Sequence, residues 1–393
     1  MDSNHPGNSV LAPDYAGGSI ADVIPATADA LGYGSAIGAE TVDRAAAVLP
    51  LGEARSAVVV LVDGLGAEQL RSRAAHAPFL RGLLGASREL SAGFPSTTAN
   101  SLSSLGTGQL PGGHGVVGYR VLDPDRDVIL NQLSWDQDTD PKLWVPDSTL
   151  LERLTEAGLD VVSLGEAKFA ERGLNQASMR GGRFRPSRLL GERAGHAIEE
   201  LKRPGNHLVY LYWGALDKVG HQKGSGSWAW LEELERIDAE LRRLAEQLPR
   251  DTLLVITADH GMVDVAHDDR LDLAAHPALR TGVRHVGGEP RAVHLYTEPD
   301  GGPGLAADLA DRWLAEIDGR GAVLTREQAI SAGLFGVVGA RARSRIGDVV
   351  VTAGPDFAVV DTANDSASAL ALLGHHGGLS TTELRIPLLT ARS

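Results

Sequence analysis

Short runs of β-branched and other apolar residues alternate along this chain with longer segments of helical periodicity. Several of the short runs are apolar on successive residues, as expected of strands that are covered on both faces of a parallel sheet. Strands that alternate with helices predict a wound α/β sheet. The predicted elements are the strands Ala57–Val62, Val161–Leu164, Leu208–Trp213, Leu253–Thr257, Ala292–Tyr296, Asp348–Thr352 and Phe357–Val360, and the helices Leu150–Ala157, Ser227–Gln247 and Leu305–Ile317.

Acidic and histidine side chains follow three of these strands. Asp63 comes directly after the first predicted strand, and Asp217 comes shortly after the third. Asp259 and His260 follow the fourth. In wound α/β sheets, ligands gather at the carboxyl ends of the strands, so we expect these side chains to lie near a binding site.

The segments Ala215–His221 and Val255–Met262 together contain two aspartates and two histidines. Oxygen and nitrogen donors in this mixture suit zinc or manganese better than calcium or magnesium. For either segment alone, the alternative is a capped helix or a satisfied surface histidine. The case for a metal site therefore depends on other segments that point to the same place.

A run of hydroxyl residues follows Pro95. The proline stops an extended segment, and Ser96, Thr97 and Thr98 come where a helix is expected to begin. A helix N-terminus binds phosphate oxygens and lowers the cost of forming an alkoxide. The alternative is an ordinary Ser/Thr N-cap.

Charge and composition exclude several classes of function. The formal net charge is −14, from 51 acidic and 37 basic side chains, which argues against nucleic-acid polymers and anionic membranes as partners. The chain has no cysteine, so thiolate zinc sites and thiol nucleophiles are excluded. The sequence shows neither a signal peptide nor an apolar segment long enough to span a membrane, so we expect a soluble, cytoplasmic protein.

The segment between His260 and His376 is longer than a sheet connection needs, so we expect an inserted lid subdomain at about residues 280–345. A local cluster of positive charge falls on or beside this lid. It is either a solvated basic face or a site that recognises a remote phosphate or acidic group of a substrate. The cluster consists of Arg280, Arg284, His285 and Arg291.

Five short motifs follow one another along the chain. They are a strand followed by Asp63-Gly64, Phe-Pro-Ser-x-Thr at Phe94–Thr98, Asp-x-x-Gly-His at Asp217–His221, Asp-His-Gly-Met at Asp259–Met262, and His376-Gly377. This order resembles the alkaline phosphatase superfamily, and most closely its nucleotide pyrophosphatase/type I phosphodiesterase branch. The resemblance covers about Ala57 to Leu389. It implies an alkaline phosphatase-like α/β fold with a central, mostly parallel sheet between helical layers and two bound divalent metal ions.

The resemblance also implies the roles of individual residues. Thr98 aligns with the nucleophilic threonine of the family and would lie between the two ions as a ligand of the metal centre. The ions would be zinc, with manganese also suited, because every ligand is oxygen or nitrogen. The two sets of ligands would be Asp63, Asp259 and His260 for one ion, and Asp217, His221 and His376 for the other.

One position departs from the family pattern. The branch usually has an asparagine shortly after its His-Gly motif, which holds a non-bridging phosphate oxygen, and the aligned residue here is Tyr119. The tyrosine hydroxyl could donate instead, or Asn100 or Asn131 could serve. His375, directly before the expected ligand His376, would support the ligands or simply be exposed.

The resemblance predicts a metal-dependent hydrolase of small phosphate esters, specifically a phosphodiesterase or nucleotide pyrophosphatase that forms a phospho-threonine intermediate. The alternatives are a phosphomonoesterase or phosphonate hydrolase on the same scaffold, and a non-catalytic binding protein that retains the fold. Residues 51–393 would form the catalytic domain, and residues 1–50 an N-terminal arm and lead-in packed on its core. The oligomeric state is left open.

Overall fold

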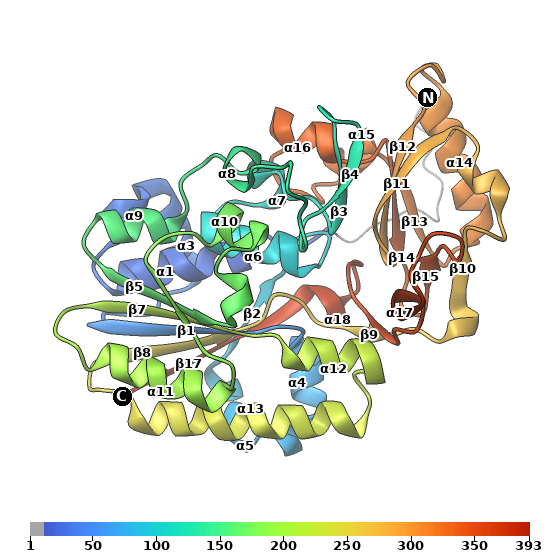
Figure 1. Ribbon diagram of the computed structural model, residues 1–393. Helices are drawn as coiled ribbons and strands as arrows, with labels where there is room; N and C mark the ends of the chain where they lie inside the picture. The colour runs from blue at the N-terminus through green and yellow to red at the C-terminus, as the bar shows by residue number, and fades with distance from the viewer. Residues whose placement is uncertain (1–11) are drawn as a thin grey trace.

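The computed structural model describes residues 12–393. Residues 1–11, where the predicted N-terminal arm begins, lie outside this range. Within the described range, a central sheet of seven strands has helices on both faces, as Figure 1 shows. In spatial order its strands are β2 (Arg88–Ser91), β17 (Arg385–Arg392), β8 (Thr252–Thr257), β1 (Ser56–Val62), β7 (His207–Trp213), β5 (Asp160–Gly165) and β6 (Arg183–Pro186).

The sheet is mostly parallel. The neighbouring strands from β8 to β6 all run parallel, whereas β17 is antiparallel to both β8 and β2. Every residue of β1 is buried, which explains its continuous apolar run. The predicted α/β fold is therefore confirmed. Because β1 lies between β7 and β8, the carboxyl ends of these three strands meet at one place.

Helices cover the two faces of this sheet (Figure 1). The longest, α13 (Trp228–Gln247), begins after Ser227, whose side chain accepts a hydrogen bond from the Trp230 amide. It buries an apolar stripe that runs from Trp230 to Leu244. One layer contains α4 (Ala67–Ser72), α5 (Pro78–Leu83), α11 (Leu190–Leu201), α12 (Ala215–Lys223) and α13 (Trp228–Gln247). The other layer contains α1 (Val23–Ala30), α3 (Ala39–Val48), α6 (Thr98–Thr107), α9 (Leu150–Glu156) and α10 (Gly173–Ser178).

The described part of the N-terminal segment packs on the same core as the sheet. Ile20, Val23 and Ile24 are fully buried and belong to one hydrophobic cluster with Val59 of β1. Burying these side chains attaches the segment to the face of the sheet that also carries α6.

A second sheet lies beside the main one and is antiparallel throughout. Within the described chain it has four strands and its own small core, in which Trp313 of α14 (Leu305–Ile317) is fully buried. The lid range expected from the sequence, 280–345, includes three of these strands, and the last strand along the chain lies just beyond it. In spatial order the strands are β11 (Val283–Glu289), β12 (Ala292–Thr297), β14 (Val349–Ala353) and β13 (Gly321–Thr325).

Within residues 12–393, no helix combines the length and the apolar character that a membrane span requires. The remaining elements of this range are short. The short strand pairs are β3 (Arg120–Asp123) with β4 (Val128–Asn131), β9 (Val263–Asp264) with β16 (Gly374–His375), and β10 (Arg270–Asp272) with β15 (Ala358–Val360). The short helices are α2 (Gly34–Ile37), α7 (Pro111–His114), α8 (Pro141–Trp144), α15 (Arg326–Ser331), α16 (Ala340–Arg345), α17 (Ala367–Leu370) and α18 (Thr381–Leu384), with 3-10 turns at Ile20–Asp22, Ala74–His76, Leu84–Ala86, Ala167–Phe169, His267–Asp269 and, as η6, Pro277–Arg280.

Candidate active site

Three aspartates converge where the central strands end. Asp63 directly follows β1 and Asp259 follows β8, and both are buried. Asp217 lies in the first turn of α12, just after β7. Because β7, β1 and β8 are neighbours, their parallel ends bring these three carboxylates together from distant parts of the sequence.

Histidine side chains complete two groups of possible metal ligands. Donor atoms of Asp63, Asp259 and His260 lie within 4.8 Å of one another, and so do those of Asp217, His260 and His376. His221 Nε2 lies 3.4 Å from Asp217 Oδ2, so His221 adjoins the second group. The rings of His260 and His376 stack with their centroids 3.7 Å apart. The six aspartate and histidine residues expected as ligands therefore lie in one cluster, with His260 between its two halves.

Each of these histidines has its Nδ1 occupied by a backbone carbonyl. The acceptors are the carbonyl oxygens of Gly374 for His221, Gly261 for His260 and Ser96 for His376, at 2.7, 3.0 and 2.9 Å. A carbonyl oxygen can only accept, so Nδ1 carries the proton and the Nε2 lone pair faces the aspartates. This is the arrangement by which proteins orient histidine ligands toward a metal.

The carboxylates keep buried oxygens that accept no hydrogen bond from the described residues, namely Asp63 Oδ1, Asp217 Oδ1 and Asp259 Oδ2. His260 Nε2 lies 3.5 Å from both Asp63 Oδ1 and Asp259 Oδ2. Burial, and then the charges of Asp259 and Asp217, hold the pKa of Asp63 well above its usual range. Lone pairs that face one another across such gaps are stabilised by a cation, so these residues fit divalent metal ions.

The hydroxyl segment lies against this cluster. Thr98 is the first residue of α6, and its Oγ1 lies 3.2 Å from His260 Nε2. Thr97 occupies the N-cap position with an extended backbone, but its side chain accepts no capping hydrogen bond. The alternative interpretation of the hydroxyl run as an ordinary Ser/Thr N-cap is therefore wrong, because the Thr97 hydroxyl does not cap the helix. Ser101, one turn into the helix, donates to the Asp259 carbonyl oxygen at 2.7 Å and ties α6 to the end of β8.

The loop that carries His376 is held from both sides. Ser96 Oγ donates to the Gly378 carbonyl oxygen at 2.9 Å and accepts from the Gly377 amide at 3.1 Å. The amide of Gly378 donates to Glu383 Oε1 at 2.8 Å. His375 is buried, 3% exposed, so the interpretation of His375 as an exposed residue is wrong.

Two cavities share Thr98, Leu133 and Asp217 in their walls. The larger cavity, of about 620 Å³, extends along the second sheet. The smaller, of about 240 Å³, is mostly apolar. Sequence reasoning missed it, although Tyr210 and Tyr212, two residues apart on β7, were a signal that one face of this strand carries aromatic rings. Its apolar and aromatic wall includes Leu102, Phe169, Met179, Phe184, Tyr210 and Tyr212.

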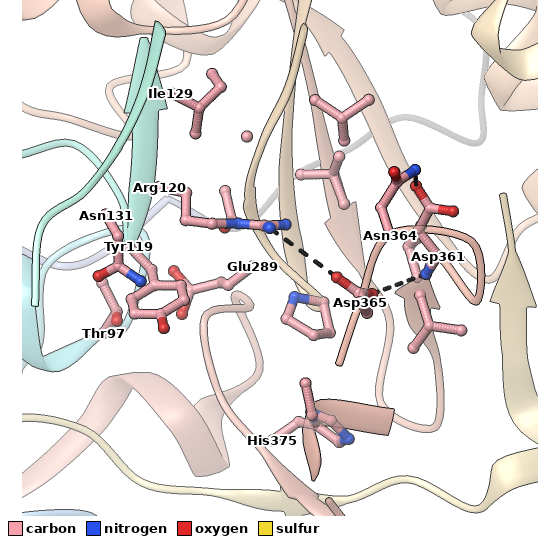
Figure 2. Close-up of a pocket in the computed structure, with 18 of the residues that line it drawn as sticks. Thr97, Tyr119, Arg120, Ile129, Asn131, Glu289, Asp361, Asn364, Asp365 and His375 are labelled. Carbon is pink, nitrogen blue, oxygen red and sulfur yellow. Dashed lines mark hydrogen bonds and ion pairs between the residues drawn. The ribbon is translucent and has the colours of Figure 1, made fainter. Parts of the chain in front are cut away.

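The residues expected to bind phosphate oxygens are placed differently from one another. Tyr119 and Asn131 line the larger cavity, and Figure 2 shows them next to each other, near Thr97. Asn100 is fully buried, its amide nitrogen donates to the Pro95 carbonyl oxygen at 2.8 Å, and it is not part of the wall of either cavity.

The basic cluster on the lid is not one solvated face. Arg291 is fully buried and makes two hydrogen bonds to the carboxylate of Glu383, at 2.6 and 2.8 Å. The interpretation as a solvated face is therefore wrong for this residue. Arg280 contacts Asp361, and both line the larger cavity. Arg284 and His285 also line it and both contact Asp127.

Two further polar residues were missed by sequence reasoning. The Tyr212 hydroxyl donates to Asp63 Oδ2, which fixes the orientation of this carboxylate. Glu289, at the end of β11, is buried, and its Oε2 lies 3.7 Å from His376 Nδ1. Glu289 belongs to no recognisable motif, so no signal in the sequence could have found it.

Comparison with known proteins gives consistent results. A family model described as type I phosphodiesterase/nucleotide pyrophosphatase matches residues 57–379. The phosphopentomutase of Psychromonas ingrahamii is 32% identical over 120 residues, which cover 30% of this chain but only 27% of that protein.

Solved structures resemble most of the fold. Human ectonucleotide pyrophosphatase/phosphodiesterase 5 superposes with a TM-score of 0.67 at 18% identity, covering 85% of this chain and 87% of that one. Phosphonoacetate hydrolase of Sinorhizobium meliloti, in complex with phosphonoformate, gives 0.63 at 22% identity, covering 86% and 90%. At these identities the likeness establishes a shared architecture.

Proposed function

The chain belongs to the type I phosphodiesterase/nucleotide pyrophosphatase family, and we propose that it hydrolyses diester or pyrophosphate bonds in small phosphate esters through a covalent intermediate on Thr98. The observation that carries this proposal is the position of Thr98, whose hydroxyl lies beside the aspartate and histidine cluster and which lines both cavities. A phosphodiester has two substituents on phosphorus, and each of them needs room beside the nucleophile. A monoester needs only one such space.

We propose that two divalent ions, zinc or alternatively manganese, bind in the cluster. Thr98 would lie between them and contribute its hydroxyl oxygen. When bound, the ions would neutralise phosphate charge and lower the pKa of the Thr98 hydroxyl. The ligands would be Asp63, Asp259 and His260 for one ion, and Asp217, His221 and His376 for the other.

The proposed reaction has two displacement steps. In the first, the Thr98 hydroxyl loses its proton to solvent and Oγ1 attacks phosphorus, while the leaving alcohol or nucleotide departs with the bonding electron pair and takes up a proton from solvent. In the second, water attacks the phospho-threonine, and Thr98 Oγ1 leaves and is restored to a hydroxyl. The N-terminus of α6 favours the negative phosphoryl group during both steps because its amides and dipole point toward it.

Tyr119 and Asn131 are the proposed ligands of the non-bridging phosphate oxygens. Both side chains line the larger cavity and can donate a hydrogen bond, from a phenol hydroxyl and from an amide nitrogen. Asn100 is not retained in this proposal, because its amide is buried and already donates to the Pro95 carbonyl oxygen. Hydrogen bonds of this kind orient the phosphoryl group for in-line attack.

The proposal is tested by metal analysis of the purified protein together with turnover of bis-(p-nitrophenyl) phosphate and p-nitrophenyl phosphate. We expect bound zinc or manganese and a higher kcat/KM for the diester. A higher kcat/KM for the monoester would instead identify a phosphomonoesterase. No hydrolysis of either ester by a metal-replete sample would favour a binding protein that retains the fold.

A further inference from the structure

The larger cavity contains an arginine that neither the motifs nor the proposed mechanism uses. Arg120 is the first residue of β3 and directly follows Tyr119. Figure 2 shows its guanidinium group inside the cavity, between Glu289 on one side and Asp365 on the other. Its side chain is 37% exposed, so it is accessible to a molecule that enters the cavity.

Arg120 is only weakly paired, in contrast to the other arginines of this cavity. Arg280 and Arg284 each hydrogen-bond to a carboxylate. The carboxylate nearest to Arg120 is Asp365, at 3.9 Å from Nη1, beyond hydrogen-bonding distance. Its Nε donates to the Gly288 carbonyl oxygen at a long 3.4 Å, and neither Nη atom makes a hydrogen bond within residues 12–393. Four of the five guanidinium N–H groups are therefore available to a ligand.

The position of Arg120 relates it to the proposed reaction. Arg120 Nε donates to the carbonyl oxygen of Gly288, the residue directly before Glu289, and both Arg120 and Glu289 line the larger cavity. Glu289 in turn lies 3.7 Å from the ring of His376. Arg120 is thus separated from the proposed metal centre by one intervening side chain. A substituent on phosphorus that enters the larger cavity would pass beside it.

We propose that Arg120 binds a second anionic group, a carboxylate or a phosphate, carried by the substituent that occupies the larger cavity. This inference rests on the proposed function and specifies its class of substrate. A guanidinium can bind either anion through two parallel hydrogen bonds. Asp365 does not depend on Arg120, because its carboxylate accepts from the Asp361 amide at 2.8 Å. Arg120 can therefore turn to a ligand without leaving Asp365 unpartnered.

The test compares three p-nitrophenyl esters that share a leaving group. Ethyl p-nitrophenyl phosphate has no second anion, whereas the 2-carboxyethyl and 2-phosphonooxyethyl analogues carry a carboxylate and a phosphate. We expect the zinc-loaded protein to show a kcat/KM at least about tenfold higher for one or both charged esters, since a charge-assisted pair contributes at this level. Which ester is preferred identifies the anion.

Arg120→Met is expected to abolish this preference while leaving kcat/KM for the ethyl ester within about threefold, because the lost pair involves only the second anion. Arg120→Lys should keep part of the preference. Arg284→Met is the matched control, because it removes a cavity arginine that is already paired with Asp127, and it should keep the preference. The inference is overturned if the unmodified protein treats the three esters alike. It is also overturned if Arg120→Met slows all three equally, or if Arg284→Met abolishes the preference as well.

A binding measurement separates this inference from the proposed function. Calorimetry of the zinc-loaded protein with ethylphosphonate and 2-carboxyethylphosphonate, and with the 2-phosphonooxyethyl analogue, needs no turnover. Tighter binding of a charged ligand that disappears in Arg120→Met would support the anion site even if no ester is hydrolysed. Equal binding of all three ligands would contradict the anion site even if the esters are hydrolysed.

Discussion

At the carboxyl ends of β1, β7 and β8, referred to here as the sheet end, three aspartates each keep a buried oxygen that accepts no hydrogen bond from residues 12–393. The arginines of η6 and β11, in contrast, contact carboxylates of the chain itself. The two regions therefore balance their charge differently. The sheet end has an excess of acceptors and needs cations from solution. The side formed by η6 and β11 carries its own counter-ions. The oxygens are Asp63 Oδ1, Asp217 Oδ1 and Asp259 Oδ2, and the pairs are Arg280–Asp361 and Arg284–Asp127.

This difference indicates which substitutions should change metal binding and turnover and which should not. Unpartnered buried oxygens cost free energy, and a protein keeps them where a ligand offsets that cost. Paired surface charges contribute little to stability and need no ligand. Substitutions at the sheet end should therefore change metal binding and turnover, whereas those among the paired lid arginines should leave both nearly unchanged.

The largest effect is expected for Thr98→Ala. Loss of the proposed nucleophile should lower kcat for bis-(p-nitrophenyl) phosphate by about ten-thousand-fold or more, with both metals retained. Turnover assays and metal analysis of the variant measure this. Thr107→Ala removes a hydroxyl at the other end of α6 and is the matched control, which should stay within a few-fold of the unmodified protein. A fully active Thr98→Ala protein would refute the nucleophile assignment.

The next largest effect concerns Arg291, a fully buried arginine of the lid. Arg291→Met leaves the Glu383 carboxylate buried without its partner and should cost about 3–5 kcal/mol in the free energy of unfolding. Denaturant titration measures this loss. Adding Glu383→Gln removes the stranded charge but keeps an acceptor for the Gly378 amide, so the double variant should recover part of the stability. If Arg291→Met lowers the free energy of unfolding by no more than Arg284→Gln does, the buried and the exposed arginine contribute equally to stability and the distinction between them is wrong.

Metal removal should destabilise the sheet end. Zinc at about 100 times its dissociation constant should stabilise the fold by about 2.7 kcal/mol, because it binds the native state alone. Chelation should therefore lower the Tm, and zinc should restore it. Asp63→Asn weakens one proposed ligand set, so zinc should raise its Tm by less. A Tm that is insensitive to both chelator and zinc would mean that these aspartates do not form a metal site.

The smallest effect is expected for Arg284→Gln. The pair with Asp127 is well exposed, so its loss should change the free energy of unfolding by about 0.5 kcal/mol or less. Turnover of bis-(p-nitrophenyl) phosphate should be unaffected. The comparison of the two regions would fail if Arg284→Gln lowered turnover, or if it weakened zinc binding as Asp63→Asn is expected to do.

Much of the fold was predictable because buried parallel strands have a simple sequence pattern. The continuous apolar runs that became β1, β7 and β8 were identified to within a residue. β17 was not predicted, although it joins β2 to β8 in the sheet. It contains Pro387, which argues against an interior strand. Pro387 is aligned with Glu89 of β2, and the pairing with β8 begins only at Leu388, so the missing amide costs no hydrogen bond on that side.

Residues that belong to local motifs were also easier to predict than residues whose surroundings depend on distant contacts. Asp63, Asp217 and Asp259 follow strands, so their convergence could be anticipated from strand order. The roles of Arg291 and His375 could not. Arg291 reads as a surface charge in its own segment, but in the fold it is buried between Glu383 of α18 and the Phe357 carbonyl oxygen. His375 was open to two interpretations, and its burial follows from the pairing of β16 with β9.

The sequence alone determined the α/β class, the strands that end in aspartates, and a hydroxyl segment at a helix start, because these depend on periodicity and on residues adjacent in the chain. Only the tertiary structure decided which charges are paired. Arg280, Arg284 and Arg120 look alike in the sequence, but their partners lie far along the chain, so the weak pairing of Arg120 emerges only when the chain is folded. The electrostatic state of a side chain depends on what lies within a few ångströms in space, and sequence separation does not report that distance.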